Sequence, residues 1–75
     1  MKDVEVNKEP VELYKILKFE GWASSGGEAK QFIADGQVQV NGQVELQKRK
    51  KIIPGDVISF GEETARVVLK RSVAE

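Results

Sequence analysis

The segment from Ser25 to Gly42 constrains the fold most, because a helix start, a helix stop and a hairpin turn follow one another in it. Ser25 and Glu28 have the spacing of a capping box, in which the serine oxygen accepts a hydrogen bond from a free backbone N–H and the glutamate reaches back to the cap. The next apolar residues keep helical spacing and lead to Gly36, a typical helix stop: Ala29, Phe32 and Ile33. The sequence therefore predicts a helix of about ten residues, which is stable only when it packs against another element.

A first helix is predicted just before this segment. Its apolar residues recur at i, i+3 and i+4: Leu13, Ile16 and Leu17. Pro10 suits the start of this helix and Gly21 its end, and the short link to Ser25 brings the two helices close together. Lys15 and Lys18 lie away from the apolar stripe, so they share the outer face of the helix.

Alternating valines followed by Asn41-Gly42 are a strong hairpin signal. A two-residue turn would set Val40 opposite Gln43. A three-residue loop with a left-handed glycine sets Val38 opposite Val44 on one face, and we favour this register because burial of one face of the hairpin fixes it.

Two further strands are expected after the hairpin. Pro54-Gly55 marks a turn before a strand from Val57 to Phe60, and a second turn at 61–63 precedes a strand from Thr64 to Leu69. The fold class is therefore α+β, with two short packed helices followed by a small, mostly antiparallel sheet.

The length of 75 residues allows one domain with one small core. We expect the core motif at about 11–60, with loosely ordered ends. The first nine residues form either a loose lead or a short edge strand through Val4 and Val6, and residues 70–75 are expected to fray.

Cysteine and histidine are absent, which removes disulfides, thiolate chemistry, the most common general base and the usual zinc ligands. Adjacent carboxylates occur only at Glu62 and Glu63, in a predicted turn where water solvates both. We therefore expect no enzyme, no metal and no cofactor. The absence of a signal-peptide pattern and of any membrane-spanning run predicts a cytoplasmic protein, which we expect to be a monomer.

The basic quartet, Lys48 to Lys51, stands out because the whole chain is neutral, with 12 basic and 12 acidic residues. Such a run is either a solvated face or a phosphate-binding edge. With Lys30 and the lysines of the first helix it could form one continuous basic surface. If side chains alternate through the quartet, Arg49 and Lys51 share one side, and we expect that pair to dominate binding.

Two weaker candidates lie between the helices. Trp22 is either a lid on the small core or a platform on which a nucleic-acid base stacks. The segment Ser25, Gly26 and Gly27 is not a phosphate loop, because no strand precedes it and the lysine and hydroxyl of that motif are not at the required spacing. Free amides at a helix start can still bind one phosphate, so this segment is a weak secondary contact.

Several short motifs occur in a fixed order over about Val11 to Phe60: Leu13 to Leu17, Ala23 to Ser25, Glu28 to Lys30, Ile33, Gly36, Val38 to Gly42 and Pro54 to Asp56. This order resembles the alpha-L RNA-binding family, named after the fourth small-subunit ribosomal protein. The small size, Glu20 to Trp22 and Lys48-Arg49 look most like the stand-alone bacterial YbcJ-type members.

The resemblance implies binding of structured RNA, usually ribosomal or transfer RNA, by the two helices and the segment after the hairpin. It assigns this role to the matching basic residues: Lys15, Lys18, Lys30, Lys48, Arg49, Lys50 and Lys51. Many members carry arginine where this chain has Glu12 and Gly26. These departures remove positive charge from the helical side and give the quartet more weight.

The leading hypothesis is a non-catalytic RNA-binding protein that reads phosphate spacing and shape. One alternative is a protein-interaction module, associated with the ribosome or another ribonucleoprotein, that uses the hairpin edge or Trp22. A helix-turn-helix DNA binder is a further alternative, although the second helix offers a single lysine beside Glu28 and Asp35.

Overall fold

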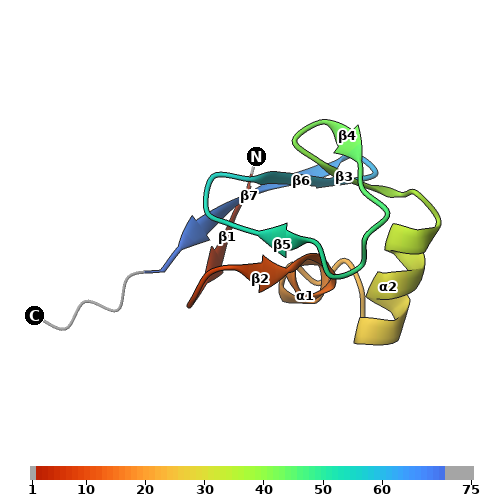
Figure 1. Cartoon of the computed structure of the whole chain (residues 1–75), viewed down its shortest axis with the longest axis horizontal. Coiled ribbons are helices and arrows are strands. Elements are labelled where there is room, and N and C mark those ends of the chain that lie inside the picture. The colour runs from red at the N-terminus through yellow and green to blue at the C-terminus, as the bar shows by residue number, and fades with distance from the viewer. Residues whose placement is uncertain (1, 71–75) are drawn as a thin grey trace, which may run out of the picture.

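Two short helices lie on one side of a five-stranded sheet in the computed structural model, which describes residues 2–70 (Figure 1). The elements in chain order are β1 (Lys2–Val6), β2 (Val11–Glu12), α1 (Leu13–Phe19), α2 (Gly26–Ala34), β3 (Val38–Val40), β4 (Gln43–Val44), β5 (Lys51–Ile52), β6 (Val57–Phe60) and β7 (Glu63–Leu69). The sheet has the order β1-β7-β6-β3-β4, and β2 and β5 form a separate two-stranded ribbon. Every pairing is antiparallel except β1 with β7. The predicted α+β class is confirmed.

Helix α2 begins and ends at the residues that the sequence marks. The Ser25 hydroxyl oxygen accepts a hydrogen bond from the Glu28 N–H at 3.1 Å. The Glu28 carboxylate reaches back one residue further than predicted, to the Ser24 N–H at 2.7 Å. At the other end Gly36 has a φ of +77°, and its N–H bonds to the Ile33 carbonyl. This left-handed stop turns the chain directly into β3.

Helix α1 begins at Leu13 and not at Pro10, so the predicted start is wrong by nearly a turn. Glu12, its N-cap residue, makes no side-chain capping bond. Backbone carbonyls of the basic quartet take that place: the Leu13 N–H bonds to Lys50 O at 2.9 Å and the Tyr14 N–H to Lys48 O at 3.1 Å. The quartet is therefore attached by its backbone to the first turn of α1, where free N–H groups need partners.

The hairpin register predicted from the sequence is wrong. Val40 pairs with Gln43 across a two-residue turn, in which Asn41 has a φ of 53° and Gly42 a φ of 87°. Both values are those of the turn that best matches the twist of paired strands. Val44 consequently faces outward with 54% of its surface exposed, which is tolerated because β4 is an edge strand.

Hydrogen bonds from elsewhere in the chain hold this turn. The Asn41 side-chain amide donates to the Asp56 carboxylate at 3.1 Å and its oxygen accepts from the Val57 N–H at 2.9 Å. Asp56 also accepts from the Ile53 N–H. The two motifs Val38 to Gly42 and Pro54 to Asp56 therefore form one bonded unit.

The start of the chain is the edge strand β1, one of the two alternatives that the sequence allows. It runs parallel to β7, and Val4 and Val6 are buried in the core. Strands β1 and β7 therefore lie before and after residues 11–60 in the chain and pair with each other, where loosely ordered ends were expected. The predicted fraying falls mainly on residues 71–75, which lie outside the described residues.

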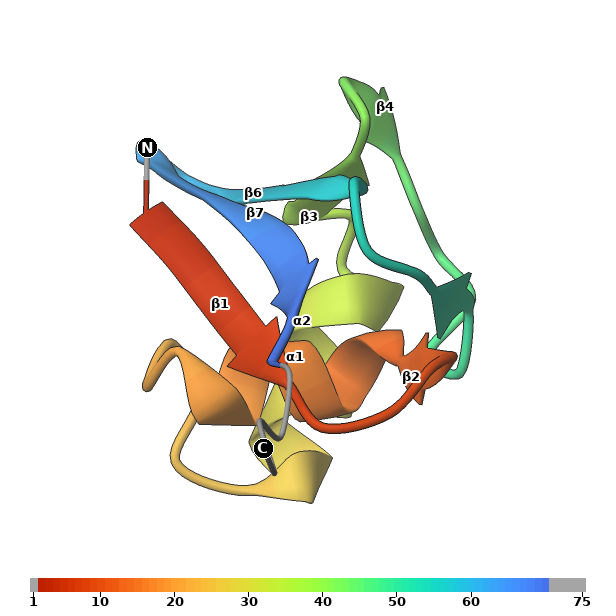
Figure 2. The ribbon, with the colours of Figure 1, turned by 90° about the vertical axis from the view of Figure 1, so that its left-hand side faces the viewer.

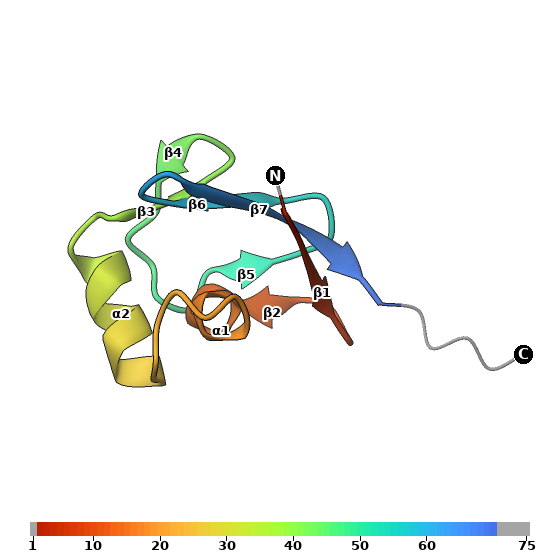
Figure 3. The same ribbon diagram turned by 180° about the vertical axis from the view of Figure 1, so that it is seen from behind.

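The core lies between the main sheet, the helices and the β2–β5 ribbon (Figures 1 and 3). In the ribbon, Val11 pairs with Ile52 and both side chains are buried. Glu12 pairs with Lys51 in the next position of the ribbon. Facing residues of an antiparallel pair lie on the same side, and neighbouring residues along a strand lie on opposite sides. The side chains of Glu12 and Lys51 therefore both point away from the core. Within residues 2–70 no helix is long and apolar enough to cross a membrane.

Candidate nucleic-acid interface

The basic quartet is a turn followed by a strand start. The Lys50 N–H bonds to the Gln47 carbonyl at 3.2 Å, so Lys48 and Arg49 occupy a turn and Lys51 opens β5. Strand-like alternation through the quartet is therefore absent. Arg49 and Lys51 nevertheless both lie next to Glu12, one through an ion pair and the other as its neighbour across the ribbon.

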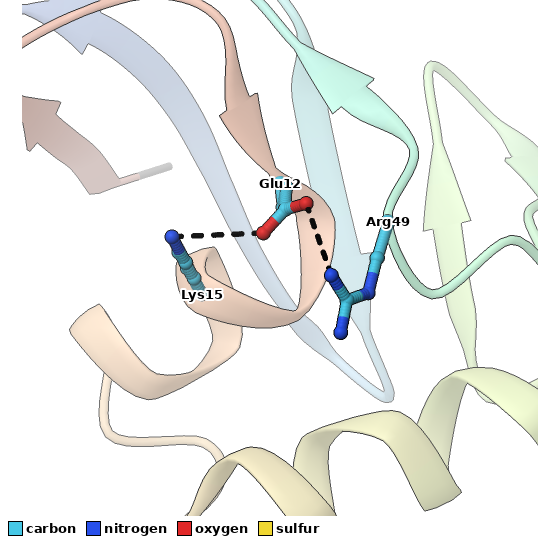
Figure 4. Close-up of polar contacts among 3 residues, drawn as sticks. All are labelled: Glu12, Lys15 and Arg49. Carbon is cyan, nitrogen blue, oxygen red and sulfur yellow. Dashed lines mark ion pairs between the residues drawn. The ribbon is translucent and has the colours of Figure 1, made fainter.

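Glu12 links cations from two elements (Figure 4). One carboxylate oxygen lies 3.5 Å from Lys15 Nζ and the other lies 3.7 Å from an Arg49 guanidinium nitrogen. These distances are those of loose, solvated ion pairs, since both basic side chains are about half exposed or more. Pairs of this kind are worth about 0–1 kcal/mol, so a phosphate can replace the carboxylate at little cost.

The ring of Tyr14 gathers cations from three separate elements. Lys30 Nζ of α2 lies 4.8 Å from the ring centroid, Arg49 Cζ of the turn 5.8 Å and Lys15 Nζ of α1 6.0 Å. All three fall within the range of cation–π attraction, which holds a cation over an aromatic ring without neutralising it. We call Lys15, Lys30, Arg49 and Lys51 the basic cluster, with Tyr14 and Glu12 between its members.

The other predicted lysines lie apart from the basic cluster. Lys50 borders a shallow hollow beneath the β3–β4 hairpin, together with Asn41 and Gln43. Lys18 is exposed on α1 and Lys48 is exposed in the turn. Within the described part of the chain, neither forms an ion pair or approaches the Tyr14 ring.

Trp22 packs against the core. Its ring stacks on Phe60, with centroids 5.8 Å apart and planes 27° from parallel, and Phe60 in turn contacts Phe32 at 4.8 Å. The indole N–H is buried and has no hydrogen-bond partner among residues 2–70. One face of the ring is therefore already occupied, which supports the role of a core lid.

The start of α2 is occupied by its own side chains. Ser25 Oγ is bonded to the Glu28 N–H, and the Glu28 carboxylate accepts from both the N–H and the hydroxyl of Ser24. A carboxylate at this place repels phosphate. Gly26 lies close to the Tyr14 ring, because a Cβ there would be 3.5 Å from Tyr14 Cε2. The segment therefore serves helix capping and the packing of Tyr14.

Sequence reasoning missed Tyr14. Its signal was present, since Tyr14 lies beside Lys15 and outside the apolar stripe of α1. In the structure the ring is half-buried and packs against the edge of the core. The convergence of Lys30 and Arg49 on this ring depends on how α1, α2 and the turn pack together. No local pattern contains that information.

Comparisons with known proteins agree with this architecture. Residues 4–68 match the S4 domain family. The putative RNA-binding protein YbcJ of Escherichia coli (strain K12) is 48% identical over 69 residues, covering 91% of this chain and 99% of the relative. An uncharacterized protein YbcJ of Shigella flexneri matches to the same extent.

The solution structure of YbcJ from E. coli, described as having an alpha-L motif involved in RNA binding, superimposes with a TM-score of 0.70. It is 48% identical and the match covers 91% of this chain and 87% of that one. The resemblance to YbcJ-type members predicted from the sequence is confirmed. A family match over most of the chain, together with a relative of this identity and coverage, shows that the chain belongs to the S4 domain family.

Proposed function

We propose that this protein binds structured RNA through the basic cluster and catalyses no reaction on it. The observation that carries the proposal is the gathering of three cations from α1, α2 and the quartet turn around Tyr14, at 4.8 to 6.0 Å from the ring. Cations that already lie close together around one ring need less rearrangement to meet neighbouring phosphates, so binding costs less ordering entropy. Lys18, Lys48 and Lys50 are proposed as outer contacts.

The relatives support the same function. The E. coli protein carries the name of a putative RNA-binding protein, and its solved structure is described by a motif involved in RNA binding. Nearly half of the residues are identical over almost the whole of that relative. The proposed ligand is ribosomal or transfer RNA, free or within a ribonucleoprotein, bound by a monomer in the cytoplasm.

RNA suits this surface better than duplex DNA. The bases of an RNA helix are hidden in a deep, narrow groove, so proteins recognise its shape and its phosphates. A DNA-reading helix needs several base-contacting side chains, whereas α2 offers Lys30 between Glu28 and Asp35. The basic cluster is a set of phosphate contacts and not a base-reading helix.

Titration of a structured RNA and of a duplex DNA of equal length, over a range of salt concentrations, tests the proposal. If Lys30, Arg49 and Lys51 each neutralise one phosphate, log affinity for RNA falls with log salt at a slope of about 2 to 3. We expect the RNA to bind more tightly at every salt concentration. Equal affinity for both nucleic acids would favour the DNA-binding alternative, and an affinity independent of salt would exclude the phosphate contacts.

A second candidate function is a protein-interaction module associated with the ribosome. The observation in its favour is an exposed apolar pair beside Gly36, formed by Val44 and Leu46, which are 54% and 59% exposed. Purified ribosomes would distinguish the two functions. Binding that survives neutralisation of the basic cluster and is lost in Leu46→Asp supports the protein contact, and the reverse pattern supports RNA.

A further inference from the structure

A hollow of about 390 Å³ lies beside the basic cluster. Its lining residues come from the end of β1, the turn between β1 and β2, strand β2, the outer face of α1 and the start of β5. Figure 2 shows the backbone course of β1, β2 and α1. The volume is at the lower end of the range for small-molecule sites, so it suits a ligand of about the size of one nucleotide.

Phe19 gives this hollow an aromatic wall. It is the last residue of α1, and 58% of its surface is exposed although it is among the largest apolar side chains of the protein. It lies one helical turn after Lys15, on the same side of the helix. The core does not use this ring, and an exposed aromatic face beside lysines offers a surface on which a base can stack.

The charge around the hollow favours an anion. Its lining residues include three lysines, Lys8, Lys15 and Lys51, and a single carboxylate, that of Glu12. The carboxylate already faces Lys15 at 3.5 Å and Arg49 at 3.7 Å. The excess of lysines is therefore available for phosphate groups near the rim.

The hollow and the basic cluster share residues. Lys15, Lys51 and Glu12 border the hollow and also belong to, or pair with, the cluster. A nucleic-acid strand that contacts Lys15 and Lys51 would therefore also lie beside the hollow that Phe19 lines. Every nucleotide of an RNA carries both a phosphate for the lysines and a flat base for the aromatic wall, whereas an acidic peptide offers a ring only where it contains an aromatic residue.

We propose that the hollow receives one unpaired nucleotide of the bound RNA, with its base stacked on Phe19 and its phosphates held by Lys8, Lys15 and Lys51. This inference rests on the proposed RNA binding and adds to it a preference for RNA with a bulged or flipped-out nucleotide. Unstacked bases of irregular RNA are the parts that aromatic side chains recognise.

The test compares two RNA hairpins that differ in a single unpaired 2-aminopurine nucleotide within the stem, with the free 2-aminopurine mononucleotide as a third ligand. Wild-type protein, Phe19→Leu and the control Ile53→Ala, which alters another exposed apolar side chain, are titrated with each. We expect the bulged hairpin to bind at least about fivefold tighter than the paired one, with a change in 2-aminopurine fluorescence. Phe19→Leu should lose most of that preference, and Ile53→Ala should keep it.

The outcomes separate the inference from the function beneath it. Equal affinity of wild-type protein for the two hairpins, or an unchanged preference in Phe19→Leu, overturns the nucleotide site while leaving RNA binding intact. Binding of the free mononucleotide as tightly as the bulged hairpin overturns RNA as the source of the nucleotide. Failure of both hairpins to bind removes the proposed function and the inference together.

Discussion

Glu12 contacts members of the basic cluster, and under the proposed function we expect its charge to weaken the attraction of that cluster for RNA. Among the described residues it forms ion pairs with Lys15 and Arg49. Its side chain is 25% exposed and makes no capping bond to α1. It therefore competes with phosphate for two cations without contributing much to folding.

Substitution of Glu12 by glutamine should raise RNA affinity by about fivefold, because removing a competing charge worth about 1 kcal/mol frees Lys15 and Arg49 for phosphate. The measurement is a titration of wild-type and Glu12→Gln protein with the same structured RNA at low salt. Glu62→Gln, an equal charge change at an exposed turn, serves as control. An affinity that falls, or that rises equally in the control, would contradict this role.

Tyr14 acts through its ring and not through its hydroxyl, since the three cations approach the ring face or edge and no hydrogen bond of the hydroxyl is found in the described residues. Tyr14→Phe should therefore retain RNA affinity. Tyr14→Leu should lose about fivefold, the equivalent of about 1 kcal/mol from exposed cation–π contacts. Equal affinities for the two variants, with unchanged circular dichroism spectra, would rule out the ring.

At the scale of elements, helix α2 depends on its cap because a helix of 9 residues is marginal on its own. Ser25→Ala removes the acceptor for the Glu28 N–H and should cost about 1 kcal/mol. For a domain of this size that corresponds to a melting temperature about 4–8 °C lower. Thermal unfolding followed by circular dichroism measures it.

Ser25→Asn is the matched control, because asparagine caps helices as well as serine does. We expect its melting temperature to stay within about 2 °C of wild type, since the cap contributes most of the difference. If Ser25→Asn and Ser25→Ala melt together, the loss does not come from the cap.

The signals at the two ends of α2 were predicted correctly from the sequence, whereas the start of α1 at Pro10 was not. Ser25 and Gly36 bound α2 because a cap and a left-handed stop are local chemistry. The hairpin was placed correctly but given the wrong register. Burial of Val44 was weighed above turn geometry, whereas the left-handed Asn41 and its bonds to the Asp56 region determine the pairing.

Arrangements that depend on distant segments could not be read from the sequence. The β2–β5 ribbon joins residues nearly forty positions apart, and β1 pairs with the far end of the chain in β7. The same limit applies to the candidate site. Lys15, Lys30 and Arg49 were recognised as basic residues, but their meeting at Tyr14 follows from the packing of α1, α2 and the turn.

At the scale of the whole molecule, function depends on where charge lies, because the chain carries no net charge. At the β1–β7 edge, basic residues are balanced by acids: Lys2 pairs with Glu63 and Arg66 with Asp3. The basic cluster gathers four cations around two residues, Tyr14 and Glu12. Within the described residues, the basic cluster is therefore better suited to a polyanion than the β1–β7 edge, where acidic residues balance the basic ones.

The central claim is that RNA binds at the basic cluster. Removing the same amount of positive charge from the basic cluster and from the β1–β7 edge tests this claim most directly. The first double variant carries Arg49→Ala and Lys51→Ala, in the basic cluster. The second carries Lys2→Ala and Arg66→Ala, at the β1–β7 edge. All four residues are exposed, so their substitution changes stability little. RNA affinity is measured for both double variants over a range of salt. We expect the first to lose at least about tenfold in affinity and its salt slope to fall by about 1.4 to 1.8, while the second keeps both. Equal losses in the two folded variants would show that RNA binding follows total charge and not the basic cluster.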